Sequence, residues 1–356
     1  MKPKQLAELA VLTAVSLIIP IYNAGQYLTA CLDSVTAQTM FLRTQVLLVD
    51  DGSTDASPQI CDVYAGKYPN IEVLHRKNAG VSAARNAGLE YAAGKYVAFA
   101  DADDLLYPQM LERLVDAAEK TDAQMCICAY RAGSADGERD RTYPFAADEP
   151  FGSETLVRYM LSHEDANALW NKLFLRAPIA GNRIRMTVGR KLGEDREFIL
   201  HFLRVCDSIC YVPQTLYYYR YVESGAIRRQ KNYAKVLTAQ YASDRRQFSA
   251  LGIDKETFVR GGALCYCRRI TATIDLICRA FSGTARLRAL RVFYADDALQ
   301  SILRTVLAAA GDGLNRYERG LLLCMRLRFA AATRLWMRLL NLRTDLYRRS
   351  HEGGGP

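Results

Sequence analysis

The stretch Tyr96–Asp104, with the sequence YVAFADADD, decides the fold because it joins a buried strand to a cluster of charges. Its apolar and aromatic residues are typical of a strand inside a sheet. Asp101, Asp103 and Asp104 follow at once, and carboxylates this close together repel one another when they are ionised. Such a cluster at the carboxyl end of a strand suits Mg²⁺ or Mn²⁺, which often also bind substrate phosphates. The alternative is a solvated acidic turn that caps the next helix.

The length and composition of the chain limit the classes of protein to which it can belong. The 356 residues suggest about two domains, and 50% hydrophobic residues can fill a core. Lys and Arg number 47 against 38 Asp and Glu, a formal net charge of +9, so an anionic partner is expected. Charge alone does not distinguish a nucleotide from a lipid or a nucleic acid.

The cysteines and the N-terminal segment indicate the cellular compartment in which the protein is expected. The ten cysteines include no Cys-x-x-Cys pair, which argues against structural zinc, and we expect buried, reduced thiols in a cytosolic protein. The apolar run Leu9–Ile21 is shorter than the ~20 residues of a membrane-spanning helix. Glu8 and the lack of an Ala-x-Ala site argue against a signal peptide. The sequence therefore predicts a cytoplasmic location, with peripheral contact at the inner face of the cell membrane left open.

Strands and helices alternate in the first part of the chain. Strands are predicted at 15–20, 45–49 and 71–74, and helices at 27–39 and 82–93, with Ser57 expected to cap another helix. This order predicts an α/β fold with a doubly wound, mostly parallel sheet and helices on both faces. Ligands bind beyond the carboxyl ends of such strands. The side chains that follow these ends are Tyr22, Asp50, Asp51, Asp101 and Asp103.

The later chain changes character. A helix is predicted at 111–120 and a strand at 124–130, and the polar segment 133–148 is predicted to be a mobile loop. From Asn232 onward the pattern is helical without strand signals. We therefore expect a catalytic domain over 1–225 and a helical C-terminal region over 226–356.

Five motifs occur in an order and spacing that resemble one enzyme family. They are Pro20–Asn23, Val49–Asp55, Asn78–Asn86, Asp101–Asp104 and Gly193–Asp195. Together they resemble the inverting family-two glycosyltransferases of the GT-A fold. The islands 170–172 and 217–219 are similar to the bacterial branch that builds surface polysaccharides. The resemblance implies transfer from a sugar nucleotide, usually a UDP-sugar, to a glycan or lipid-linked acceptor, with inversion at the anomeric carbon.

The resemblance also assigns the donor site. Tyr22 can stack on a base or pack beneath its turn. Either Asp51 or Asp50 can accept a hydrogen bond from a pyrimidine imide, or both can bond local amides, as Asp55 is expected to do. The full donor set is Pro20, Tyr22, Asn23, Asp50, Asp51, Gly80, Arg85, Asp101, Lys172 and Arg220.

The motif Asn78–Asn86 has three residues of interest. Gly80 lets the backbone approach a nucleoside, and Ser82 is expected to cap the helix. Arg85 faces the acidic cluster or forms a structural ion pair. Lys172 and Arg220 are weaker candidates for contact with the diphosphate, on the resemblance alone.

For the chemical step, the resemblance makes Asp101 and Asp103 ligands of Mn²⁺ or Mg²⁺, with Asp101 also near the ribose. Asp104 is expected to orient the loop or cap the next helix. Displacement with inversion needs one base opposite the leaving diphosphate, and the resemblance assigns Asp195 rather than Glu194. The alternative for this acidic pair is a helix N-terminus that favours carboxylates. Trp170 is either an acceptor platform or part of the core.

The region 316–349 is predicted to be a basic amphipathic helix. Its apolar stripe is Leu321, Met325, Phe329, Ala332, Trp336 and Leu340. Such a helix can lie in an anionic membrane interface, or it can pack its apolar face on the catalytic domain.

Two other functions compete with the glycosyltransferase. A sugar nucleotidyltransferase would need a Gly-rich, basic phosphate loop after the first strand, and Pro20–Asn23 is not one. A non-catalytic nucleotide-binding protein would not need both the metal aspartates and Asp195. No nucleic-acid partner is expected, because the basic residues concentrate in the tail without a matching motif.

Overall fold

The structure is a computed structural model that describes residues 13–134, 137–147, 149–190, 192–221, 232–333 and 335–336. The chain forms two compact units. Unit 1 has the boundaries Met1–Val157 and Asp165–Glu223, and unit 2 has the boundaries Arg158–Glu164 and Ser224–Pro356.

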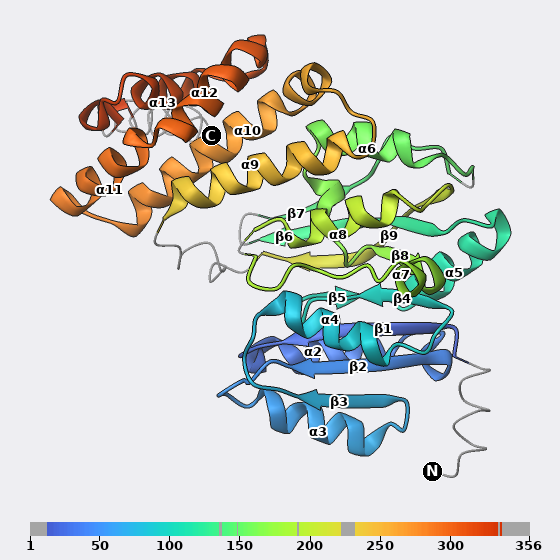
Figure 1. Ribbon diagram of the computed structural model, residues 1–356. Coiled ribbons are helices and arrows are strands. Elements are labelled where there is room, and N and C mark those ends of the chain that lie inside the picture. Colours follow the sequence, from blue (N-terminus) through green and yellow to red (C-terminus); the bar gives the residue numbers. More distant parts are fainter. Residues whose placement is uncertain are drawn as a thin grey trace, which may run out of the picture. The chain divides into compact units, whose positions relative to one another are not determined.

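Unit 1 is organised around one sheet (Figure 1). Among the described residues its strand order is β3-β2-β1-β4-β8-β6-β9-β5, with β7 beside β6. The first four strands in this order are parallel, β8 is antiparallel to both of its neighbours, and β6 and β9 are parallel. The strands are β1 (Val15–Ile21), β2 (Thr44–Asp50), β3 (Ile71–His75), β4 (Tyr96–Phe99), β5 (Leu105–Leu106), β6 (Met125–Ser134), β7 (Gly137–Arg141), β8 (Lys172–Leu175) and β9 (Ile209–Arg220).

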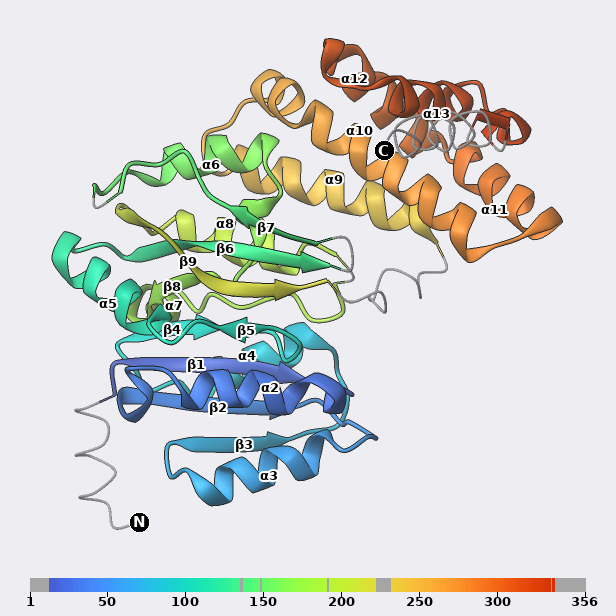
Figure 2. The ribbon, with the colours of Figure 1, turned by 180° about the vertical axis from the view of Figure 1, so that it is seen from behind.

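Helices cover both faces of this sheet: α4 (Val81–Tyr91) lies on one face, and α2 (Gly25–Thr36) lies on the other (Figures 1 and 2). Helix α2 buries Leu28, Cys31, Leu32 and Val35, which share one face at helical spacing. Helix α4 comes so close to β1 that a side chain at Gly88 would collide with Ile18. The other helices of unit 1 are α3 (Ser57–Lys67), α5 (Met110–Thr121), α7 (Arg176–Gly181) and α8 (Glu194–Leu203), together with the first half of α6 (Ser153–Ser162).

Three local predictions are wrong. The segment 133–148 is not simply a loop, because β6 continues to Ser134 and β7 pairs with it as an antiparallel strand. Ser57 does not cap α3: it is the first helical residue, and its hydroxyl accepts a hydrogen bond from the Ala24 amide. Ser82 does not cap α4 either, because the N-cap is Gly80.

The cysteines differ in part from the prediction. Cys126 and Cys210 are paired in a disulfide, since they occupy facing positions on the neighbouring strands β6 and β9. The prediction of reduced thiols is therefore wrong for these two. The other eight cysteines are buried and free.

Unit 2 consists of helices in the part that the structure describes. They are α9 (Tyr233–Ser249), α10 (Lys255–Ala280), α11 (Gly283–Ala295), α12 (Asp297–Ala309) and α13 (Arg316–Arg326), with the end of α6. The long helix α10 packs against the other four. Phe258, Ile274, Leu290, Tyr294 and Leu303 are at most 1% exposed in this core.

The predicted single helix over 316–349 is interrupted. Helix α13 ends at Arg326, and Arg328 adopts a left-handed φ of 54°, so the apolar residues on either side do not form one stripe. Leu321 and Met325 are fully buried, whereas Phe329 is 58% exposed. The rest of the predicted stripe from 337 on, including Leu340, lies outside the described residues. None of the described helices is both long enough and apolar enough to cross a membrane.

Candidate active site

The sheet register brings the predicted site residues to one edge. Ile21, the last residue of β1, faces Asp50 on β2, and Ile18 on β1 faces Phe99 on β4. Because these strands are parallel, the loops that follow them all leave from the same edge. The segments after β1, β2 and β4 therefore contribute to one site.

The first two loops are joined by hydrogen bonds. The Asn23 amide donates to Ser53 Oγ at 3.0 Å, and the Thr54 amide donates to Asn23 Oδ1 at 2.7 Å. Asn23 has a left-handed φ of 51°, which asparagine tolerates better than most residues. This turn follows the partly buried Pro20 and leaves Tyr22 47% exposed, so the Tyr22 ring is available to a ligand.

Asp51 holds the loop that precedes α4. Its carboxylate is 2% exposed and accepts hydrogen bonds from the amides of Ala79 at 3.0 Å and Gly80 at 2.7 Å. Gly80 has a φ of 92°, and the space beside it is open. At Gly52 a Cβ atom would lie 2.8 Å from the Asn78 nitrogen, so glycine permits this close approach of two loops.

Asp50 has different partners. Its Oδ1 accepts a hydrogen bond from the Ser53 amide at 2.9 Å, and its Oδ2 lies 2.9 Å from His75 Nδ1. Burial alone would raise the pKa of Asp50, but the bonds from Ser53 and His75 hold it below its usual value. Asp50 therefore braces the turn, while Asp51 positions the backbone around Gly80.

Arg85 links two aspartates that are far apart in the sequence. Its Nη2 lies 2.8 Å from Asp101 Oδ1, and its Nη1 lies 2.5 Å from Asp195 Oδ1. The Arg85 side chain is 4% exposed, whereas those of Asp101 and Asp195 are 29% and 24% exposed. One buried guanidinium thus holds the end of β4 against the start of α8, and both carboxylates still reach solvent.

Asp195 lies in the first turn of α8, after the left-handed N-cap Gly193. Burial raises the pKa of Asp195 to about 7, although the charge of Arg85 opposes the rise. Only Oδ1 of Asp195 is bonded within the described part of the chain, so Oδ2 is free to accept a proton. A carboxylate with a pKa near neutrality is well matched to general-base catalysis.

The other two acidic residues of the opening stretch differ from each other. Burial, and then the charge of Asp101, raises the pKa of Asp103. Asp104 is fully buried, and it accepts hydrogen bonds from the Tyr217 hydroxyl at 2.8 Å and the Arg220 amide at 2.7 Å. Burial and the charge of Asp101 raise its pKa to about 8. Asp104 therefore orients the loop against β9 and does not cap α5, whose N-cap is Gln109.

Aromatic rings support this arrangement from β9. Trp170 stacks on Tyr217 with ring centroids 4.5 Å apart and on Tyr219 at 5.4 Å. It is 7% exposed, so of its two predicted roles the structure favours the core over an exposed platform. The Tyr217 hydroxyl also accepts a hydrogen bond from the Asp101 amide at 3.1 Å. The run of three tyrosines at 217–219 does not by itself predict this role of Tyr217.

The two weaker diphosphate candidates have different surroundings. Lys172 is fully buried, and its Nζ donates to the Ala168 carbonyl at 2.6 Å and to Asn171 Oδ1 at 2.9 Å. Burial lowers the pKa of Lys172 to about 7. The Arg220 guanidinium lies over the Tyr27 ring at 5.2 Å, and its buried Nε has no hydrogen-bond partner among the described residues. Arg220 is thus the better placed of the two to meet an anion.

Comparison with known proteins identifies the family of this chain. The model of glycosyl transferase family 2 matches residues 16–183. The glycosyltransferase GlyG of Streptococcus pneumoniae is 30% identical over 225 residues, which are 60% of this chain and 73% of GlyG. The chain belongs to glycosyl transferase family 2.

A second relative and a solved structure extend the comparison. Escherichia coli YibD, an uncharacterized glycosyltransferase, is 35% identical over 222 residues, which are 60% of this chain and 63% of YibD. The chain thus spans less than two thirds of that relative. The crystal structure of S. aureus TarS 1-349 in complex with UDP-GlcNAc has a TM-score of 0.64 at 19% identity and covers 93% of this chain and 92% of TarS 1-349. This likeness confirms the predicted fold class.

The metal expected in this family 2 chain has two candidate ligands. The described residues contain no cluster of three or more His, Cys, Asp or Glu side chains that could hold a metal by themselves. Asp101 and Asp103 fit a different mode of metal binding, in which one or two carboxylates bind the ion together with substrate phosphates. Burial and the charge of Asp101 raise the pKa of Asp103, although the charge of Arg220 opposes this, and a bound cation would favour the ionised form.

Proposed function

We propose that the chain transfers a sugar from a UDP-sugar to a hydroxyl group of a glycan or lipid-linked acceptor, with inversion, in the assembly of a bacterial surface polysaccharide. Membership of family 2 supports the reaction class. A related protein from Bacillus subtilis, 33% identical over 220 residues, is the minor teichoic acid biosynthesis protein GgaB. TarS, which shares the fold, has been solved with UDP-GlcNAc and with UDP, and this supports a uridine nucleotide as donor.

The observation that carries the proposal is the Arg85 bridge. It places the carboxylate of Asp195 near Asp101, the carboxylate of the donor site. The acceptor oxygen forms its bond to the anomeric carbon while the bond from that carbon to the diphosphate breaks. The acceptor proton passes to Oδ2 of Asp195, because Oδ1 is held by Arg85. Attack from the side opposite the diphosphate inverts the anomeric carbon.

Donor binding is assigned to the other side of the site. The exposed Tyr22 ring offers a face to the base, and aromatic–base stacking contributes about 1–3 kcal/mol. Asp51 positions the amides and the open backbone at Gly80, where a nucleoside can approach closely. Arg220 is proposed to contact the diphosphate, whereas the buried Lys172 supports the site from within.

Asp101 and Asp103 would hold Mn²⁺ or Mg²⁺ together with diphosphate oxygens. The ion would neutralise the charge that develops on the departing diphosphate. Two carboxylates at the end of β4, one of them with a raised pKa, suit this ion.

Removal of divalent metal is therefore expected to weaken UDP binding. The affinity should fall by about tenfold or more with EDTA, since a lost charge-assisted contact costs about 1.5–3 kcal/mol. Calorimetric titration of UDP with Mn²⁺ and with EDTA measures this, and Asp103→Ala should make the two conditions alike. Glu112→Ala, an acidic residue on α5, is the control and should keep the metal dependence. Equal UDP affinity with and without metal in the unsubstituted protein would contradict the role of Asp101 and Asp103.

The donor itself is found by a screen. Purified protein is incubated with a panel of nucleotide sugars and Mn²⁺, and release of the nucleoside diphosphate is followed. The proposal expects one or a few UDP-sugars to be turned over, and the Asp195→Asn variant to be inactive with the same donors. Turnover of a sugar phosphate with a nucleoside triphosphate would instead indicate a nucleotidyltransferase.

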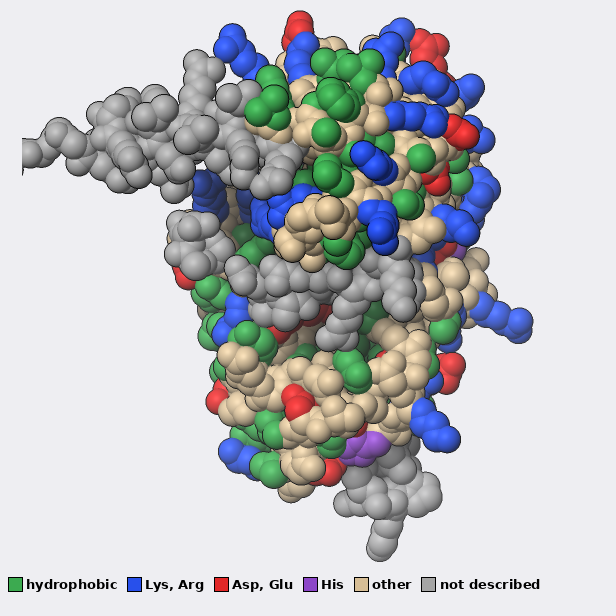
Figure 3. Space-filling view, turned by 90° about the vertical axis from the view of Figure 1, so that its left-hand side faces the viewer, with side chains coloured by type: hydrophobic (Ala, Val, Ile, Leu, Met, Phe, Trp, Pro, Cys, Tyr) green, Lys and Arg blue, Asp and Glu red, His purple; other side chains and the backbone are tan. Residues whose placement is uncertain are grey.

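We further propose that the protein works at the cytoplasmic face of the membrane through unit 2. Figure 3 shows many Lys and Arg side chains, with hydrophobic ones among them, on the unit 2 part of the face that it draws. Near the end of α13, Leu323, Leu327, Phe329 and Leu335 are 52–65% exposed. Exposed apolar side chains beside basic ones suit an anionic membrane interface.

The double substitution Leu327→Ser/Phe329→Ser is expected to lower binding to anionic vesicles severalfold. The change removes apolar side chains but no charge. It therefore distinguishes insertion of apolar side chains into the membrane from electrostatic attraction to the anionic surface. Co-sedimentation with phosphatidylglycerol vesicles, at low and high salt, is the measurement. Leu42→Ser is the control, because Leu42 is 86% exposed in unit 1. If the double variant sediments like the unsubstituted protein, the membrane role of this segment is wrong.

A further inference from the structure

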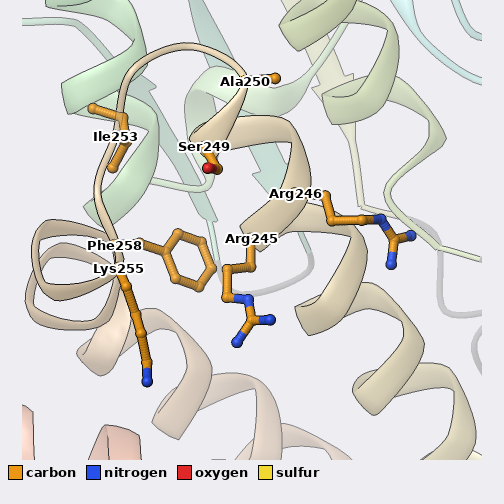
Figure 4. A pocket seen from close by; sticks show the side chains of 7 residues that line it. All are labelled: Arg245, Arg246, Ser249, Ala250, Ile253, Lys255 and Phe258. Atoms are coloured by element: carbon orange, nitrogen blue, oxygen red, sulfur yellow. The ribbon is translucent and has the colours of Figure 1, made fainter.

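Unit 2 contains a basic hollow that the proposed reaction does not use. It has a volume of about 660 Å³ and lies where α9 ends and α10 begins (Figure 4). The side chains of Arg245 and Lys255 extend on either side of the Phe258 ring, and Arg246 points away from this pair. The rest of the lining is Ser249, Ala250 and Ile253.

The floor of the hollow is rigid and apolar. Phe258 is 1% exposed, and its ring packs against Tyr241, Phe248 and Tyr266 with centroids 5.5–5.9 Å apart. Ile253 is 5% exposed. Arg245 comes from the last turns of α9, and Lys255 is the first residue of α10. The positions of Arg245 and Lys255 in the chain are therefore fixed by two helices that pack against each other.

The acidic residues nearest in sequence do not neutralise these cations. Asp254 caps α10, accepting hydrogen bonds from the amides of Glu256 at 2.8 Å and Thr257 at 3.0 Å. The Glu256 carboxylate pairs with Arg260 at 2.8 Å. Asp244 is 2% exposed and pairs with Arg269.

The same holds for the other acidic residues of 232–333. Each of them has a partner of its own: Asp275 with Tyr317, Asp296 with the Leu299 amide, Asp297 with Arg328, Asp312 with Arg319 and Glu318 with Arg268. Arg245, Arg246 and Lys255 form no ion pair within the described part of unit 2. The hollow therefore keeps an uncompensated positive charge.

We propose that this hollow binds a phosphate ester, for which glycerol 3-phosphate is the probe. The Arg245 fork and the Lys255 ammonium suit a phosphate placed between them. The phosphate can belong to a soluble ester or to the headgroup of an anionic lipid. This inference does not depend on the glycosyl-transfer proposal, because every residue in it belongs to unit 2.

The probe is sn-glycerol 3-phosphate, titrated by calorimetry into the full chain, with glycerol as the neutral comparison. Arg245→Gln/Lys255→Gln should weaken binding by about tenfold or more, the effect of losing charge-assisted contacts. Arg288→Gln/Arg291→Gln is the matched control, because it removes the same charge from exposed residues on α11. Arg245→Lys/Lys255→Arg keeps the charge and should keep binding. All four substituted positions are exposed, so the fold should survive, and thermal unfolding checks this.

Vesicles then identify the source of the phosphate. Binding to phosphatidylglycerol vesicles is compared with binding to neutral phosphatidylcholine vesicles for the site variant and the control variant. If Arg245→Gln/Lys255→Gln loses the preference for phosphatidylglycerol and the control keeps it, the ligand is a lipid headgroup. If the site variant loses only its binding of glycerol 3-phosphate, the ligand is a soluble ester. Equal weakening by the site variant and the control, or no binding of glycerol 3-phosphate by the unsubstituted protein, would overturn the proposal.

Discussion

Asp195→Asn is expected to lower single-turnover sugar transfer by about 10²–10⁴-fold while leaving the affinity for UDP nearly unchanged. The amide keeps the size of the carboxylate, and its oxygen can still accept a hydrogen bond from Arg85. It cannot accept the proton of the acceptor hydroxyl. The loss should therefore fall on the chemical step, because the donor is bound by other residues.

Glu194→Gln is the control for this variant. Glu194 is the neighbour of Asp195 in the first turn of α8, but the bond to Arg85 is made by Asp195. Transfer by Glu194→Gln should stay within about tenfold of the unsubstituted protein, well short of the loss of a general base. If Glu194→Gln is the inactive variant, or Asp195→Asn keeps near-normal turnover, the base is wrongly assigned.

The pH dependence of the transfer rate should report the same group. Burial raises the pKa of Asp195 to about 7. A base acts only when it is deprotonated, so the rate should be high above that pKa and fall as the pH is lowered through it.

Arg85→Met is expected to destabilise the fold by about 3–5 kcal/mol, because it leaves two partly buried carboxylates without their cation. The charge of Arg85 opposes the rise in the pKa of Asp195, so without it that pKa should rise further. Transfer at pH 7 should then fall, and the midpoint of the pH–rate profile should move to higher pH. Denaturant unfolding and single-turnover rates across pH measure the two effects.

Arg190→Met is the matched control for Arg85→Met. Arg190 pairs with Glu197 at 3.0 Å in the same unit, and neither residue is in the bridge from Asp101 to Asp195. This control should lose stability without moving the pH midpoint. An unshifted midpoint in Arg85→Met would show that Arg85 is structural and does not tune the base.

Much of unit 1 could be predicted because its signals are local. Hydrophobic runs marked the parallel strands, and the carboxylates after β2 and β4 marked their carboxyl ends. The sequence predicts that Asp104 orients the loop or caps a helix, and the structure shows that its partners come from β9, more than a hundred residues later. For Arg85 the sequence likewise leaves two alternatives open, and the position of Asp195 on α8 decides between them.

The failed predictions share a cause. Ser57 is the first residue of α3 and Ser82 is the second residue of α4, because the choice of N-cap depends on how the preceding loop enters the helix. The strand β7 is polar and exposed, so no hydrophobic alternation marked it. The disulfide partners are 84 residues apart, and only the pairing of β6 with β9 brings them together. Each of these features depends on tertiary context.

The anomeric configuration of the released sugar tests the central claim most directly. The UDP-sugar found in the screen is incubated with the protein and Mn²⁺, so that the sugar is transferred to water or to an added acceptor. Proton NMR then records the anomeric configuration of the first product, before a free sugar can mutarotate. From an α-linked UDP-sugar, displacement assisted by Asp195 predicts that the β anomer forms first. First formation of the α anomer, or no turnover of any UDP-sugar, would contradict the account.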